Sequence, residues 1–168
     1  YIMTKLALLL LFALLVPSTF TTSLSKCPQG CFCDLDPSGR YYTECNKPKT
    51  MVEFEPRDFD EKMEVIIVRD PKHMLTIGPL FSRFKKLETL RITGANVPAI
   101  GTRSFWGVLS LRTLDLSQNN ITLINNENFY GMQNLVELSL ASNKISRVPS
   151  GTFGYLRVRT NAHSIIAT

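Results

Sequence analysis

The chain has 168 residues, enough for one domain, and 44% of them are hydrophobic. Its formal net charge of +5 includes Lys5, and its basic residues neither cluster nor alternate with aromatic residues, so the composition does not indicate nucleic-acid binding. The sequence contains no Gly-rich phosphate loop, no nucleophile elbow and no cluster of His and acidic residues. It therefore predicts no enzyme, no cofactor and no metal site.

The first part of the chain has the pattern of a secretory signal peptide. Leu6–Val16 is an uninterrupted apolar run that follows a basic residue and precedes a segment rich in Ser and Thr. Such a run is too short to span a bilayer, which takes about 20 residues in a helix. Ser23 and Ser25 suit the small-residue positions before a cleavage site, so we expect residues 1–25 to be removed by a cut before Lys26. A buried N-terminal helix is the alternative interpretation.

All four cysteines follow directly, at Cys27, Cys31, Cys33 and Cys45. An even number of cysteines behind a signal peptide indicates disulfide bonds formed in an oxidising compartment. Zinc binding is the alternative, but the spacing C-x3-C-x-C-x11-C lacks the paired CxxC knuckles of structural zinc sites. Four cysteines allow three pairings, and spacing alone does not choose among them. The segment Asp36–Gly39 is a turn signal, which predicts a hairpin between the cysteines.

The centre of the chain repeats with a step of 24 residues. Within Leu111–Asn134, apolar residues surround Asn119 in the form LxxLxLxxNxIxxIxxxxFxxM, which fits neither an amphipathic helix nor a simple strand. The form recurs downstream around Asn143 and, more loosely, upstream, where Pro71 and Ala95 take the asparagine position. One aromatic residue marks each copy: Phe81, Phe105, Phe129 and Phe153. A period of roughly 20–29 residues with this Leu/Asn pattern is typical of leucine-rich repeats.

Together these features resemble the extracellular leucine-rich repeat proteins of the Slit-like and Toll-like type, which carry a cysteine-rich N-terminal cap. The resemblance covers Cys27 to Leu156 and includes CPxGCFC followed by ECN directly before the repeats. It implies an α/β solenoid: a right-handed horseshoe with a parallel β-sheet on the concave face, a mostly irregular or short-helical convex side and a disulfide-bonded cap. In that family the first cysteine pairs with the third and the second with the fourth, which implies Cys27–Cys33 and Cys31–Cys45.

The same features predict the order of the segments. We expect the cap and its connector at residues 26–62. Four repeats should follow, at 63–86, 87–110, 111–134 and 135–156. Residues 157–168 keep no repeat phase, so we expect the sequence to be an N-terminal fragment of a longer protein, with a short natural isoform as the alternative. Attachment to a membrane would then depend on a further C-terminal segment.

The concave face is defined by the side chains that alternate with the buried ones, because neighbours along a strand point to opposite sides of the sheet. In register they form three rows: Val65, Thr89, Thr113 and Glu137; Ile67, Arg91, Asp115 and Ser139; and Arg69, Thr93, Ser117 and Ala141. The polar members of these rows are the candidate binding residues, and we expect Arg91 and Asp115 to form an ion pair. An ordinary solvated sheet face is the alternative.

Asn119 and Asn143 are predicted to form a structural ladder, in which each buried amide satisfies backbone groups of a bend. The sequence N-I-T at Asn120 is the one glycosylation sequon of the chain. Because its neighbour Asn119 is expected to face inward, we expect Asn120 to face outward and to carry a glycan. Trp106, which follows Phe105 on the return arm, is expected to be a packing residue and not a binding anchor, and His73 is expected to be a surface residue.

The family resemblance implies protein binding outside the cell and no catalysis. The leading hypothesis is a recognition module of a cell-surface or secreted protein that acts in adhesion or ligand sensing. Its expected partner is a protein ligand or receptor. The competing hypothesis is a structural matrix protein, or a non-catalytic, stabilising subunit of a secreted complex.

Overall fold

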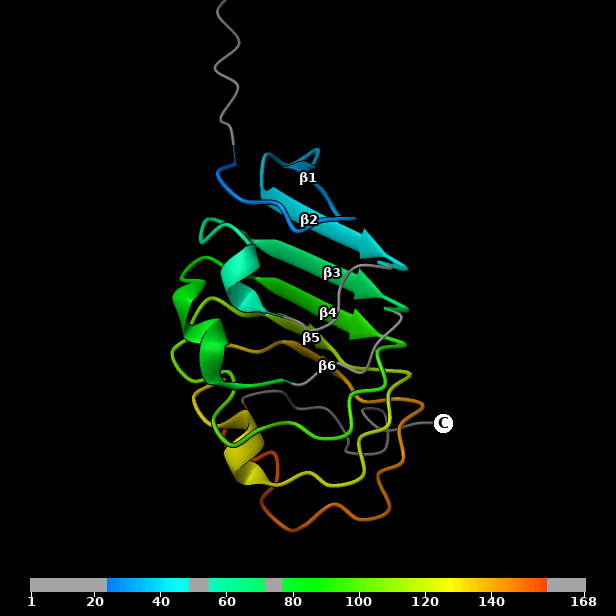
Figure 1. Cartoon of the computed structure of the whole chain (residues 1–168). Coiled ribbons are helices and arrows are strands. Elements are labelled where there is room, and N and C mark those ends of the chain that lie inside the picture. The colour runs from blue at the N-terminus through cyan, green and yellow to red at the C-terminus, as the bar shows by residue number, and fades with distance from the viewer. Residues whose placement is uncertain (1–23, 49–54, 72–76, 157–168) are drawn as a thin grey trace, which may run out of the picture.

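One six-stranded sheet runs along the solenoid (Figure 1). The computed structural model describes residues 24–48, 55–71 and 77–156. The strands follow one another in chain order: β1 (Phe32–Leu35), β2 (Tyr41–Asn46), β3 (Val65–Arg69), β4 (Thr89–Thr93), β5 (Thr113–Asp115) and β6 (Glu137–Ser139). β1 and β2 pair antiparallel, and each later strand adds in parallel to the one before it. The cap hairpin therefore supplies the first two strands of the solenoid's own sheet.

The predicted turn at Asp36–Gly39 is confirmed, and it joins β1 to β2. The Gly39 N–H donates to the Asp36 carbonyl at 2.8 Å, and Gly39 has a φ of 79°, where a residue with a Cβ is strained. The Asp36 carboxylate accepts hydrogen bonds from the N–H groups of Ser38 and Arg40 at 2.9 and 3.0 Å. Asp36 thus fixes the turn through both its backbone and its side chain.

The step of 24 residues sets the register of the parallel strands. Two of the predicted concave rows are confirmed: Val65, Thr89, Thr113 and Glu137; and Ile67, Arg91, Asp115 and Ser139. The cap strand continues both rows, with Tyr42 beside Val65 and Glu44 beside Ile67. Between the rows, Leu90 and Leu114 are fully buried. Each strand therefore gives one face to the core and one to the concave surface.

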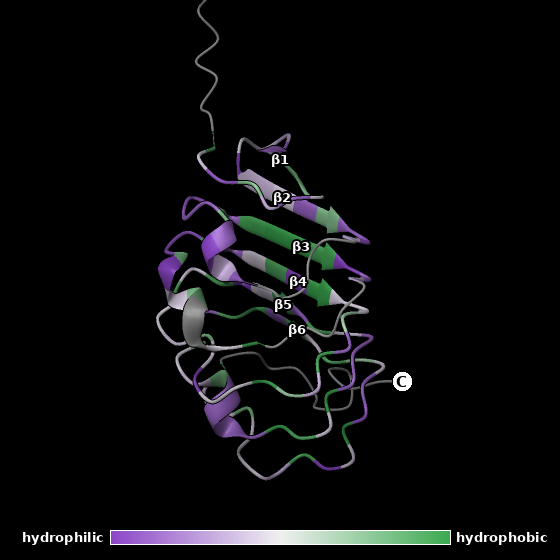
Figure 2. Cartoon of the chain, in the orientation of Figure 1, coloured by the Kyte–Doolittle hydropathy of each residue, from purple (hydrophilic) through white to green (hydrophobic). Residues whose placement is uncertain are grey.

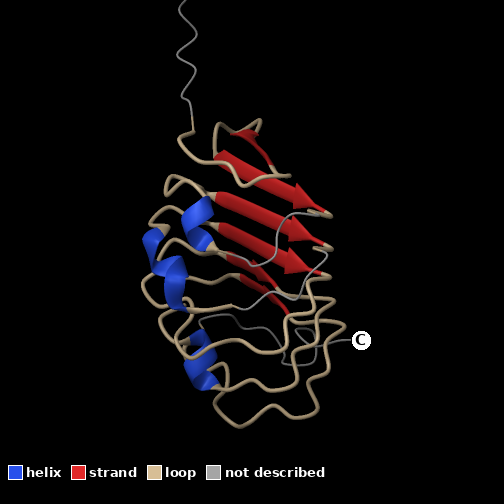
Figure 3. Ribbon diagram, in the orientation of Figure 1, coloured by secondary structure: helices blue, strands red, loops and turns tan. Residues whose placement is uncertain are grey.

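The described residues contain three short 3-10 helices: η1 (Pro56–Asp58) in the connector, and η2 (Pro79–Arg83) and η3 (Asn126–Phe129) on return arms of the repeats. They lie apart from the sheet, and loops form the rest of the arms (Figure 3). η1 and η2 begin with proline, which lacks the N–H that a first helical turn leaves unpaired. Asn125 caps η3 by accepting a hydrogen bond from the Glu127 N–H at 2.9 Å. The expected irregular or short-helical convex side is confirmed.

Aromatic side chains fill the space between the sheet and the return arms. Phe105 and Phe129 are fully buried, whereas Phe153 in the last repeat is half-buried. The ring centroids of Phe81 and Phe105 lie 5.4 Å apart, and those of Phe129 and Phe153 lie 5.5 Å apart. Tilted rings at such distances stabilise a core beyond the burial of their area. In the connector, Phe59 is buried in the same core cluster.

The Asn119 side chain forms hydrogen bonds with the bend of the preceding repeat. Its Oδ1 accepts hydrogen bonds from the N–H groups of Ala95 and Val97 at 3.0 and 3.2 Å. Its Nδ2 donates to the carbonyls of Ile92 and Leu116 at 2.8 and 2.9 Å. Because Asn119 is only 5% exposed, its side chain replaces water for backbone groups of two successive turns.

Asn143 makes similar contacts one repeat later, but it is half-buried. It accepts from the Ile121 N–H at 3.0 Å and donates to the Leu116 carbonyl at 2.9 Å. By the same register, an asparagine at position 95 would face position 71, where Pro71 has no N–H to donate. One of the two N–H donors that Asn119 uses would therefore be missing for an asparagine at position 95.

A second column of buried polar residues lies on the return arms, and it was not predicted from the sequence. Ser104, Asn128 and Thr152 are all buried and follow one another at intervals of 24 residues. The Ser104 hydroxyl donates to the Ile77 carbonyl at 3.1 Å, and Nδ2 of Asn128 donates to the Ile100 carbonyl at 2.8 Å. The Thr152 hydroxyl donates within its own arm. These side chains satisfy carbonyls of the return arms as the ladder asparagines do at the bends.

Three predicted features lie outside the described residues: residues 1–23 of the signal peptide, His73 and the tail at 157–168. Within the described ranges, no helix is both long enough and apolar enough to cross a membrane. In the same part of the chain, no three His, Cys, Asp or Glu side chains are arranged to hold a metal ion.

Candidate protein-binding face

The N-terminal end of the concave face is apolar. β3 is hydrophobic over most of its length (Figure 2), and of its residues in the concave rows Val65 is 5% exposed and Ile67 is half-buried. In the adjoining hairpin, Phe32 and Leu35 of β1 are 61% and 45% exposed. Large apolar side chains that stay exposed together mark a surface for a partner more often than scattered ones do.

These side chains line an open hollow of about 570 Å³ between the cap hairpin and the first two repeat strands. The lining residues come from β1 to β4 and from the turn: Phe32, Leu35, Asp36, Pro37, Arg40, Tyr42, Val65, Ile67, Thr89 and Arg91. Apolar side chains together with a few charged groups are the combination that binding sites use for affinity and for orientation.

Ion pairs at this end fix the charge pattern of the hollow. Arg40 pairs with Asp36 at 2.7 Å and with Glu88 at 3.6 Å. The hydrogen bond from the Arg40 backbone N–H, helped by the Arg40 guanidinium, holds the pKa of the Asp36 carboxyl below its ordinary value. In the neighbouring row, Arg69 forms an ion pair with Glu44. The charges of Arg40 and Arg69 are therefore already matched within the protein.

Arg91 is different, because its charge is not matched in this way. Its side chain is exposed, and no carboxylate of the described residues lies within 4.0 Å of it. Arg91 and Asp115 therefore do not form the expected ion pair, and the prediction is wrong on this point. Instead, the Asp115 carboxylate accepts a hydrogen bond from the Ser117 N–H at 3.0 Å. A backbone donor two residues away requires less side-chain ordering than an exposed arginine does.

Towards its C-terminal end the concave face becomes polar. The Thr113 hydroxyl donates to the exposed Glu137 carboxylate at 3.3 Å. Three further candidate residues on the face are half-buried, namely Thr93, Ser117 and Ser139. Thr89 and Arg91 are the candidate binding residues that line the hollow. The remaining candidates, including the paired Arg69, lie outside its lining.

The sequence analysis missed the contribution of the cap to this face, which comes from Phe32, Leu35 and Arg40. The available signal was Phe32, a large apolar residue between two cysteines in a segment too short to form a core of its own. Side chains of a four-residue edge strand alternate between its two faces, so the strand cannot bury all of them. One face of the hairpin is then left for the concave surface.

Two disulfides close the cap and hold this hairpin in place. Cys27 is bonded to Cys33 and Cys31 to Cys45, with Cα–Cα distances of 5.9 and 4.2 Å. This is the pairing that the family resemblance implies, and it leaves none of the four cysteines free. Cys45 is fully buried and lies beside Val68 of β3. The second bond therefore anchors the segment before β1 to the core of the first repeat.

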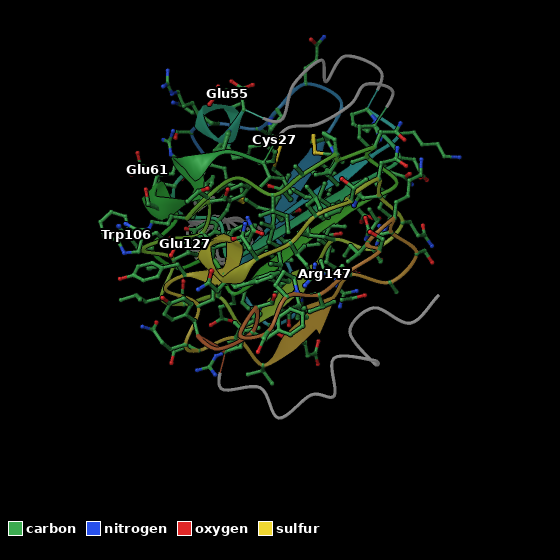
Figure 4. The ribbon with its side chains drawn as sticks, turned by 90° about the horizontal axis from the view of Figure 1, so that it is seen from below. Cys27, Glu55, Glu61, Trp106, Glu127 and Arg147 are labelled. Carbon is green, nitrogen blue, oxygen red and sulfur yellow. A yellow bond between two sulfur atoms is a disulfide. The ribbon has the colours of Figure 1, made fainter. Side chains whose placement is uncertain are left out.

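Trp106 lies on the outer side of the molecule, at its edge in the view of Figure 4. It is 61% exposed, so it lies on the surface of the return arm and not in the core. The preceding phenylalanine occupies the core position, and the Trp106 ring lies next to Gly131, where a Cβ would be only 3.1 Å from Cδ1 of the ring.

On the return arms, the Arg103 guanidinium lies 4.7 Å from the centroid of the Tyr130 ring and pairs with Glu127 at 2.9 Å.

Asn120, the predicted glycan acceptor, is half-buried, and Thr122 of its sequon is exposed. Nδ2 of Asn120 donates to Oδ1 of Asn96 at 2.9 Å. That nitrogen is the atom to which a glycan attaches, and the linkage leaves it one N–H. The contact with Asn96 is therefore compatible with a modified Asn120.

Comparison with known proteins agrees with this architecture. The family model "Leucine rich repeat" matches residues 85–145 and 109–158. Among solved structures, the chain is similar to human 5T4 (Wnt-activated inhibitory factor 1, trophoblast glycoprotein), with a TM-score of 0.57 and 17% identity. That match covers 84% of this chain and 66% of the other, so this chain spans a little under two thirds of that structure. A search of curated proteins found no match.

The parallel sheet in a 24-residue register, the asparagine ladder and the disulfide-bonded hairpin define a leucine-rich repeat solenoid with a cysteine-rich N-terminal cap. The chain has this fold, and its residues 85–158 carry the sequence pattern of leucine-rich repeats. The likeness to 5T4 concerns the fold alone. Domains of this class generally serve as protein-binding modules, because the stacked repeats build an extended concave surface.

Proposed function

We propose that this chain is an extracellular recognition module that binds a protein ligand or receptor and acts in adhesion or ligand sensing. One observation carries the proposal: at the N-terminal end of the concave face, a single hollow is lined by the exposed apolar residues Phe32 and Leu35 and by the unmatched Arg91. Aromatic residues and arginine are enriched at protein interfaces. They also dominate binding free energy where a partner removes them from water. Phe32 and Arg91 are residues of these two kinds in one lining.

The extracellular setting is supported by two features of the N-terminal region. Disulfides persist in oxidising compartments, and this cap uses all four cysteines of the chain in them. The apolar run Leu6–Val16 has the composition of a signal-peptide core. On this proposal the chain enters the secretory pathway, and Asn120 receives a glycan there. A mass decrease on treatment with an N-glycanase, absent from Asn120→Gln, tests the glycan.

The lining also indicates which part of a partner would enter the hollow. An apolar side chain would contact Phe32 and Ile67 and exclude water from them. A carboxylate next to it would pair with Arg91, whose guanidinium binds carboxylates in a bidentate manner. The partner surface is therefore proposed to carry an aliphatic or aromatic residue beside an acidic one.

The proposal is tested by screening the secreted chain against a panel of purified extracellular domains. Each interaction found is repeated with Ile67→Arg, which places a charge in the hollow, and with Leu123→Arg, which alters an exposed apolar residue outside the lining. The proposal expects partners that bind the wild type and Leu123→Arg but not Ile67→Arg. Partners that bind Ile67→Arg as well as they bind the wild type would contradict it.

A further inference from the structure

The cut expected between Ser25 and Lys26 would remove residues that the fold uses. The Ser25 backbone N–H donates to Oδ2 of Asp60 at 2.8 Å, and the Ser25 hydroxyl donates to the same oxygen at 2.7 Å. Leu24 packs against the hydrophobic core. Leu24 and Ser25 thus make specific contacts with residues far away in the sequence, as parts of a folded domain do.

Asp60 depends on these contacts because its carboxylate is buried. The residue is 4% exposed, and its Oδ1 accepts a hydrogen bond from the Lys62 N–H at 3.0 Å. Burial raises the pKa of Asp60, but the hydrogen bonds from the Ser25 hydroxyl, the Lys62 N–H and the Ser25 N–H outweigh burial and hold it below its ordinary value. A charged carboxylate in such a position is strongly unfavourable without donors. Loss of Ser25 would remove both donors shown for Oδ2.

The sequence permits a cut two residues earlier. A signal-peptide cleavage site requires small residues at the first and third positions before the bond. Ser25 and Ser23 meet this requirement for a cut before Lys26, and Ser23 and Thr21 meet it for a cut before Leu24. A cut after Leu24 fails it, because leucine is large. Among the three bonds between Ser23 and Lys26, two therefore meet the requirement, and the contacts of Leu24 and Ser25 distinguish them.

We propose that the chain is processed between Ser23 and Leu24, so that the mature protein begins with Leu24 and keeps the bonds between Ser25 and Asp60. This inference rests on the proposed entry into the secretory pathway. The step is a hydrolysis: water adds across the Ser23–Leu24 peptide bond and leaves a carboxylate on Ser23 and an α-ammonium on Leu24. A signal peptidase of the secretory membrane is the catalyst.

The direct test is N-terminal sequencing and intact-mass measurement of the protein from the medium of cells that express the full chain. The expected first residue is Leu24. A first residue of Lys26, or any other, overturns the assigned bond while leaving the proposed secretion intact. A chain that stays inside the cells with residues 1–23 attached overturns both the bond and the proposed secretion, so the two failures are distinguishable.

Substitutions at position 25 separate the two bonds by a second route. Ser25→Leu places a large residue directly before the Ser25–Lys26 bond, whereas in a cut after Ser23 it changes only the second residue of the product. Ser25→Ala keeps a small residue there and is the matched control. Both variants are expected to be processed before Leu24. Processing of Ser25→Ala with failure of Ser25→Leu would overturn the proposal.

The role of Asp60 is tested on the mature protein with an aminopeptidase. Asp60→Asn removes the charge that holds Ser25 and is expected to speed the removal of Leu24 and Ser25 at least tenfold. Asp58→Asn changes an exposed aspartate of η1 and is expected to leave the rate unchanged. Should Asp60→Asn fail to fold, Ser25→Ala, which deletes one of the two bonds, is expected to give a smaller increase. Trimming rates equal to wild type in both Asp60→Asn and Ser25→Ala would overturn the anchoring role.

Discussion

The two ends of the concave face share one register but differ in their chemistry. At the N-terminal end, β2, β3 and β4 have six, five and five residues. They lie next to the exposed apolar side chains of β1, and β4 carries the unmatched Arg91. At the C-terminal end, β5 and β6 have three residues each, and Thr113 and Glu137 hydrogen-bond to each other. The repeats therefore form the backbone of both ends, whereas the cap adds exposed apolar side chains to the N-terminal end only.

The largest effect is expected from the core that both ends share. Phe129 is fully buried and contacts the ring of Phe153, so Phe129→Ala should lower the free energy of unfolding by about 3–5 kcal/mol. Phe153→Ala, at a half-buried position, should cost less. Urea denaturation measures both changes. If Phe129→Ala cost no more than Phe153→Ala, burial would not decide the cost and this prediction would be contradicted.

Loss of the cap disulfide Cys31–Cys45 should affect the stability of the two ends differently. Replacing both cysteines by serine should lower stability by about 3 kcal/mol, because the bond closes a loop of about 15 residues in the unfolded chain. Hydrogen exchange should rise in β1 and β2 and change little in β5 and β6. Equal loss of protection in β5 and β6 would contradict the division. Peptide mapping without reduction checks the pairing itself, and any other pairing would remove the basis of this prediction.

The ladder asparagines sharpen the comparison, because Asn119 supports the bend after β4 and Asn143 supports the bend after β5. Asn119→Ala should cost about 1–3 kcal/mol, since it leaves buried backbone groups without partners. Asn143→Ala should lie at the low end of this range because water reaches the half-buried site. Thermal or urea unfolding of the two variants gives the order. The reverse order would show that burial does not decide the contribution.

Acid should weaken the N-terminal end first. The pKa values of Asp36 and Asp60 are both lowered in the folded protein, so their contribution is complete above the unfolded value of about 4 and is lost as pH falls through the folded values. Hydrogen exchange at pH 3, compared with pH 6, should increase more at residues 24–46 than at 113–143. Asp60→Asn should reduce that difference. A uniform increase along the chain would contradict this prediction.

The features that the sequence predicts correctly are those that depend on its period and on local turn chemistry. The burial of Leu90 and Leu114 follows from the 24-residue step, and the hairpin turn follows from Asp36–Gly39. The column that includes Ser104 and Asn128 obeys the same step, directly before each core phenylalanine. It could therefore have been predicted by asking which polar residues recur, as well as which apolar ones do.

The features that the sequence did not predict depend on contacts between segments. Phe32 and Trp106 are exposed because residues next to them in the sequence occupy the positions that face the core. The Asp115 carboxylate binds a local backbone N–H instead of Arg91. Ser25 reaches Asp60 across the cap. No periodicity or composition specifies these choices, because each is settled by which of several polar or apolar partners lies nearest after folding.

The central claim is that the cap-side hollow, and not the polar end of the face, provides the binding free energy. Its most direct test is the dissociation constant of a partner found in the ectodomain screen, measured for the wild type, Phe32→Ala and Ser139→Ala. Phe32→Ala should weaken binding about 30-fold, equivalent to about 2 kcal/mol at an interface hot spot, whereas Ser139→Ala should change it less than about twofold. Weakening by Ser139→Ala with unchanged binding by Phe32→Ala would contradict the claim.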